Sequence, residues 1–111
     1  MAKLEMGDPA PLGLLAFAAT TALLMFVDTE WVEAEFKEMV WGYAVWYGGI
    51  AQLVVGILEL LKGNTFGGTA FSTYGCFWLG WAAMWIHYRE QTFEGASAWL
   101  HGEAVWFATF G

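Results

Sequence analysis

Three long stretches of this chain contain no aspartate, glutamate, lysine or arginine: Pro9–Val27, Met39–Leu58 and Gly63–Tyr88. At 1.5 Å per residue, a helix formed by any of them is long enough to cross the roughly 30 Å hydrocarbon layer of a bilayer. The core of a soluble protein of 111 residues does not need three such stretches. We therefore expect an all-α protein, folded as a polytopic bundle of transmembrane helices.

The composition also favours a membrane environment. Hydrophobic residues make up 59% of the chain, aromatic residues 19% and charged residues 14%, against roughly 25% charged residues in ordinary soluble domains. Aromatic side chains are enriched where a membrane meets water. The net charge of −7 and the lack of a basic cluster exclude a nucleic-acid partner. We expect an integral, multi-pass protein of the cell membrane, with the lipid bilayer as its solvent.

The expected spans follow the charge-free stretches. Asp8 suits the N-cap of the first helix, because aspartate is a preferred capping residue. Pro9 suits the first helical position, where no backbone N–H is needed. The only four lysines and arginines divide equally between the two sides, so charge alone does not decide the topology. The sequence predicts one transmembrane domain, truncated at its C-terminus, with spans at about 9–27, 39–61 and 64–87 and an incomplete fourth at 98–111.

Small and polar residues mark two helix faces. Gly48, Gln52 and Gly56 recur every fourth residue, and glycines let a neighbouring backbone approach closely. The Gln52 amide needs a partner in lipid, either on another helix or in a pore. Thr65, Thr69 and Thr73 form a second stripe, with Ser72 beside it, which either faces a polar cavity or packs closely against another helix. Both pairs of alternatives remain open.

The chain offers no reactive constellation. Its two histidines and single cysteine do not stand at metal-site spacing, and its glycine-rich segment lacks the lysine of a phosphate-binding loop. We therefore expect no enzyme, no metal and no cofactor. Glu59 has two interpretations: it pairs with Lys62 at the membrane surface, or it is a carboxylate linked to proton movement.

Several separated motifs resemble one family, the acetate uptake transporters, or succinate–acetate permeases. The resemblance covers nearly the whole chain, and the family's Asn-Pro-Ala-Pro-Leu-Gly-Leu signature corresponds to Asp8–Leu14. The other matching motifs, in order, are Tyr47-Gly48-Gly49-Ile50-Ala51-Gln52, Gly56-Ile57-Leu58-Glu59, Lys62-Gly63-Asn64-Thr65-Phe66-Gly67 and Thr69-Ala70-Phe71-Ser72-Thr73-Tyr74-Gly75.

The resemblance implies a fold of six transmembrane helices in each protomer, assembled as a homo-hexamer with one path per protomer. This chain would supply the first three helices and the start of the fourth. The implied activity is movement of acetate and related small monocarboxylates, with succinate in some members, either by proton symport or by channel-like conduction.

The resemblance also implies site residues. Phe17 and Tyr74 would form an aromatic constriction, and the signature would line the entrance. The residues implied for the entrance, constriction and path are Asp8, Pro9, Ala10, Pro11, Leu12, Gly13, Leu14, Phe17, Gln52, Thr69, Phe71, Ser72, Thr73 and Tyr74.

Two departures from the family matter. The asparagine of the signature is Asp8 here, so either Asp8 is protonated or uptake of an anion is altered. The later helices of the family fold are absent from this sequence, so we expect that the chain alone does not transport. The alternative is a non-transporting structural or assembly protein of the membrane, or an inactive fragment.

Overall fold

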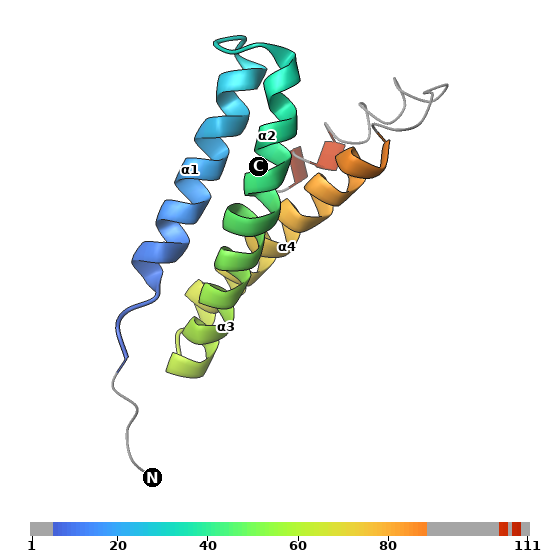
Figure 1. Ribbon diagram of the computed structural model, residues 1–111. Helices are drawn as coiled ribbons and strands as arrows, with labels where there is room; N and C mark the ends of the chain where they lie inside the picture. Colours follow the sequence, from blue (N-terminus) through green and yellow to red (C-terminus); the bar gives the residue numbers. More distant parts are fainter. Residues whose placement is uncertain (1–5, 89–104, 107, 110–111) are drawn as a thin grey trace.

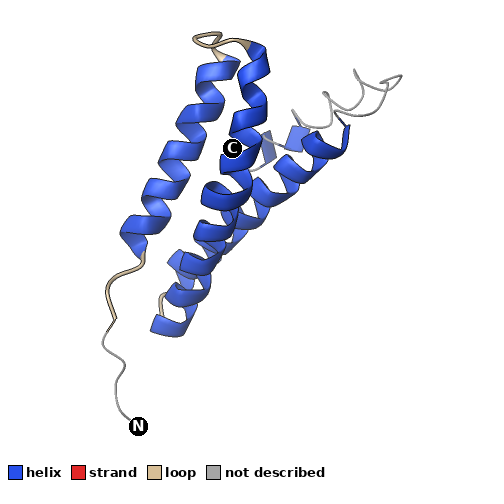
Figure 2. Cartoon of the chain, in the orientation of Figure 1, coloured by secondary structure: helices blue, strands red, loops and turns tan. Residues whose placement is uncertain are grey.

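In the computed structural model, residues 6–88, 105–106 and 108–109 are described, and all regular structure among them is helical (Figure 2). Three long helical segments lie side by side, and the third diverges from the second at one end of the bundle (Figure 1). The first segment is α1 (Ala10–Asp28) and the third is α4 (Thr65–Tyr88). The all-helical class expected from the sequence is confirmed for these residues.

The second segment changes its winding along its length. A 3-10 turn at Ala34–Phe36 leads into α2 (Lys37–Tyr43), a π-helical stretch at Ala44–Ala51 follows, and α3 (Gln52–Lys62) completes the segment. No charge or proline marks the π-helical stretch, and the sequence did not predict it. Such wide turns are frequent at functional sites, and this one ends directly before Gln52.

The first and third helical segments begin and end one residue from the expected bounds, whereas the second begins five residues earlier than expected. The helices occupy residues 10–28, 34–62 and 65–88, against 9–27, 39–61 and 64–87 expected. Most of the expected fourth segment, 98–111, lies outside the described residues. By length and composition, Ala10–Asp28 and Ala34–Lys62 suit a membrane crossing, with mean hydropathies of 2.0 and 1.7. The third helix is 24 residues long but richer in glycine and hydroxyl groups.

Glycines set how closely the helices approach. α3 makes its most extensive contacts with α4, and Gly56 lies directly against Ser72. A Cβ atom on Gly75 would lie 2.6 Å from the Leu53 backbone nitrogen and 2.8 Å from the Gly49 carbonyl oxygen. Since backbone atoms cannot move aside as a side-chain tip can, this contact requires glycine.

The end of the bundle near the α1–α2 loop contains its main aromatic core. Trp78 and Trp81 are buried there, and their rings meet edge to face at 5.8 Å. The Lys37 ammonium lies 4.4 Å from the centre of the Trp85 ring and 4.0 Å from an Asp28 carboxylate oxygen. A cation over an indole face is attracted by the ring quadrupole, so Lys37 ties the loop to α4.

Candidate functional site

The two rings expected at a constriction meet between α1 and α4. The centres of the Phe17 and Tyr74 rings lie 5.0 Å apart, and the ring planes are inclined by 61°. Both side chains are half-buried. Edge-to-face contact is a favourable arrangement for aromatic pairs, so residues 57 positions apart in the sequence form one aromatic contact across the bundle.

The signature segment divides between the inside and the outside of the bundle. Pro9 and Gly13 are buried, whereas Leu12 and Leu14 are exposed. A Cβ atom on Gly13 would lie within 2.9 Å of both Phe71 and Val55. The alternation follows the helical period, so the buried side of the signature faces α3 and α4.

Asp8 stands one residue before the N-cap of α1. The helix begins at Ala10 with Pro9 as its N-cap, one residue later than expected. The side chain of Asp8 nevertheless accepts a hydrogen bond from the Ala10 amide at 3.1 Å. It therefore still satisfies a free N–H at the start of the helix, as a capping residue does.

The Asp8 carboxylate forms an ion pair with Lys62. Lys62, at the end of α3, donates a hydrogen bond to the same Asp8 oxygen at 3.2 Å. The Ala10 amide, followed by the Lys62 ammonium, lowers the pKa of the Asp8 carboxyl below its ordinary value. Asp8 is therefore ionised at neutral pH, and its charge is balanced by Lys62.

Glu59 does not pair with Lys62, so the first interpretation of Glu59 is wrong. Its side chain is completely buried, and one carboxylate oxygen accepts a hydrogen bond of 2.6 Å from the Asn64 amide. The Asn64 side-chain oxygen accepts from the Gly67 amide, at the start of α4. Lys62 instead pairs with Asp8.

Sequence reasoning did not assign a role to Asn64. Its backbone amide also donates to the Glu59 carbonyl oxygen at 2.8 Å, so Asn64 joins α3 to α4 by both side chain and backbone. The available signal was an asparagine immediately before a helix, three residues ahead of the amide that it caps.

The expected polar contacts face two directions. Gln52 is 1% exposed, and its side-chain oxygen has no hydrogen-bond partner among the described residues. Ser72 packs against Gly56, between α3 and α4. Thr69 and Thr73 are exposed on another side of α4. Within this chain, Ser72 is therefore enclosed between two helices, whereas Thr69 and Thr73 are not.

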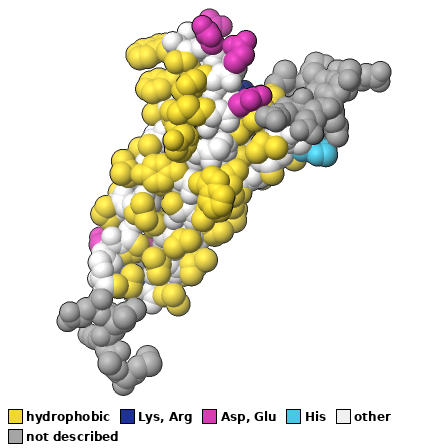
Figure 3. All heavy atoms as spheres, in the orientation of Figure 1, with side chains coloured by type: hydrophobic (Ala, Val, Ile, Leu, Met, Phe, Trp, Pro, Cys, Tyr) yellow, Lys and Arg dark blue, Asp and Glu magenta, His cyan; other side chains and the backbone are white. Residues whose placement is uncertain are grey.

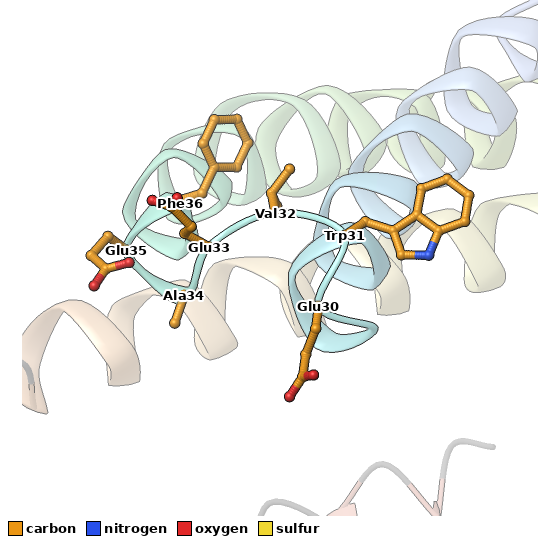
Figure 4. A pocket seen from close by; sticks show the side chains of 7 residues that line it. All are labelled: Glu30, Trp31, Val32, Glu33, Ala34, Glu35 and Phe36. Atoms are coloured by element: carbon orange, nitrogen blue, oxygen red, sulfur yellow. The ribbon is translucent and has the colours of Figure 1, made fainter.

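An open cavity adjoins α4 near Ser72. Its volume is about 430 Å³, and its lining residues are Ser72, Thr73, Cys76, Phe77 and Trp106. Two of the expected path residues thus share one hollow. A larger hollow of about 850 Å³ lies over residues 30–36, but Figure 4 shows its labelled side chains spreading in different directions, so they do not converge on a ligand.

No metal centre is formed by the described part of the chain: no three histidine, cysteine, aspartate or glutamate side chains lie together there. The described geometry offers an aromatic contact, an ion pair at the end of the bundle, and buried amide and hydroxyl groups. These groups can recognise a small polar solute without reacting with it.

Comparison with known proteins identifies the family. The GPR1/FUN34/yaaH family matches residues 1–105. The chain belongs to this family. Over 80 residues it is 48% identical to the meiotically up-regulated gene 86 protein of Schizosaccharomyces pombe, covering 72% of this chain and 26% of that protein.

Two further matches have informative names. The succinate-acetate/proton symporter SatP of Escherichia coli is 44% identical over 84 residues, covering 76% of this chain and 44% of the symporter. A solved structure, described as the bacterial acetate channel SatP, superposes with a TM-score of 0.76 at 35% identity, covering 96% of this chain and 58% of the channel chain. The fold is therefore that of the SatP channel, and this chain spans less than two thirds of the length of these relatives.

Proposed function

We propose that this chain forms part of the substrate path of a membrane transporter or channel for acetate and related small carboxylates, including succinate. The observation that carries the proposal is the structural match to an acetate channel over 96% of the chain. The named relatives are a symporter and a channel, and we propose no enzymatic activity for this protein.

The proposal places three helical segments across the bilayer. Large apolar side chains lie exposed along the bundle, among them Phe66 at 85%, Leu61 at 79% and Trp46 at 69% (Figure 3). Soluble monomers rarely expose contiguous apolar surface of this kind. Lipid tails, the remaining helices of a six-helix protomer and neighbouring copies in a hexamer would cover it.

The proposed path runs from the signature towards the aromatic contact. Removing water from a carboxylate costs several kcal/mol or more, so a path must offer donors in place of water. The buried Gln52 amide and Ser72 hydroxyl are such donors, and the Thr69 and Thr73 hydroxyls, exposed on another side of α4, would join them only where a further helix covers that side. Phe17 and Tyr74 would close the path to hydrated ions while admitting a small acid.

Replacing Phe17 by alanine is expected to admit larger acids. Loss of one ring opens the contact with Tyr74, so the uptake ratio of butyrate to acetate should rise several-fold. The measurement is uptake of butyrate and acetate in competition, in cells that express the whole protein encoded by its gene. Phe26→Ala is the matched control, because Phe26 is an α1 ring that stacks on Trp31 instead; an unchanged ratio for Phe17→Ala would count against the constriction.

The function itself is tested by uptake of radiolabelled acetate. The host should lack its own acetate uptake, and it should again express the whole protein encoded by the gene. We expect saturable accumulation that excess unlabelled acetate abolishes and that an equal concentration of chloride does not. Accumulation equal to that of cells carrying an empty vector would contradict the proposal.

A second candidate is a non-transporting structural or assembly protein of the membrane. The enclosure of Gln52 in helix contacts favours it, because a path residue should face a cavity. Accessibility separates the two candidates: a Gln52→Cys variant on a Cys76→Ser background should react with a small water-soluble thiol reagent if Gln52 lines a path. A lack of reaction would favour the structural protein.

A further inference from the structure

We propose that Asp8 acts as a tethered competitor that occupies Lys62, the residue which would otherwise bind the carboxylate group of the substrate at the entrance. This inference rests on the proposed function, since it concerns the same small carboxylates. It assigns to Lys62 the role of an anion-binding residue and to Asp8 that of an autoinhibitory contact.

The argument begins with the chemistry of the contact. The Asp8 side chain ends in a carboxylate, the same group that acetate carries. It accepts hydrogen bonds from the Lys62 ammonium at 3.2 Å and from the Ala10 amide at 3.1 Å. Pro9 and Pro11 have no backbone N–H, so the Ala10 amide is the donor between them. The Asp8 carboxylate therefore binds both this amide and the Lys62 ammonium. A second carboxylate that takes the same position on the Lys62 ammonium must displace Asp8.

The contact is placed where displacement is easy. The Lys62 side chain is 45% exposed and the Asp8 side chain 59% exposed. Exposed ion pairs of this kind are weak and are screened by salt. A free carboxylate can therefore compete with Asp8 for Lys62, so Asp8 weakens the binding of the substrate carboxylate to Lys62 without abolishing it.

The neighbouring charges favour the same exchange. Among the described residues, the titratable groups that face Asp8 are both on the last turns of α3: Lys62 attracts its carboxylate, and the buried Glu59 lies next to it. Asp8 is ionised at neutral pH, as shown above. The tether is therefore engaged in the pH range in which acetate is itself an anion.

The test measures protection of Lys62 by acetate. The purified protein in lipid nanodiscs is acylated with an amine reagent, and labelling at each lysine is quantified by mass spectrometry. Asp8→Asn is nearly isosteric and restores the residue of the family signature. In this variant we expect half-protection of Lys62 at an acetate concentration about two- to five-fold lower than in the unmodified protein, the range expected for losing one exposed ion pair.

Two controls accompany the measurement. Lys37 is an internal control, because it is held by Asp28 and Trp85 at the far end of the bundle; its labelling should not respond to acetate or to Asp8→Asn. Chloride at the same ionic strength should protect Lys62 less than acetate does in both proteins.

Equal half-protection concentrations in the two proteins, or equal protection by chloride and acetate, would overturn the inference. Uptake in cells separates it from the proposed function. Acetate uptake with no effect of Asp8→Asn on protection would refute the tether alone. Protection that depends on Asp8, without uptake by any variant, would support the tether and refute transport.

Discussion

Gly75→Ala is expected to destabilise the bundle by roughly 1–3 kcal/mol, the usual cost of overpacking a tight interior. The added methyl group would lie 2.6 Å from the Leu53 nitrogen and 2.8 Å from the Gly49 oxygen, both backbone atoms. α3 and α4 must separate to admit it, and they form the most extensive contact between elements in the bundle. Unfolding of the purified protein by denaturant in mixed micelles measures the change.

Gly80→Ala is the matched control for this prediction. It makes the same substitution on the same helix, five residues further on, but nothing lies within 4 Å of the position its Cβ would take. Alanine has the higher helix propensity, so this variant should be as stable as the unmodified protein or slightly more stable. Equal losses in the two variants would show that the α3–α4 contact does not depend on Gly75.

The fold could be predicted from the sequence because absence of charge is a strong signal over 20 residues. α1 and α4 begin and end one residue from the expected bounds. The inward position of Gly48, Gln52 and Gly56 also followed from spacing alone, and all three are buried. Helical periodicity gives the second result, since a helix must turn one face to its neighbours.

Contacts between distant residues could not be predicted in this way. Lys62 stands three residues after Glu59, so local spacing favoured that pair over one with Asp8, 54 residues away. The outcome depends on how far Glu59 is buried, which no local pattern gives. The contact of Phe17 with Tyr74 was expected only from the family resemblance, because nothing in either residue's surroundings specifies the other.

Glu59→Ala is expected to cost about 2–4 kcal/mol of unfolding free energy, since it removes a buried side chain and leaves the Asn64 amide without its acceptor. Because Asn64 also caps α4 through the Gly67 amide, the loss should loosen the start of that helix. Denaturation in mixed micelles measures the stability. Leu61→Ala, two residues away and 79% exposed, should change it little.

Glu59→Gln separates the structural role of Glu59 from a role in proton movement. The glutamine oxygen can still accept from Asn64, so we expect about half the loss of stability or less. An amide cannot take up or release a proton, however, so acetate uptake should lose its dependence on an imposed pH gradient while uptake without a gradient continues. A Glu59→Gln protein whose uptake still follows the gradient would show that the buried carboxyl group holds α3 to α4 and has no part in proton movement.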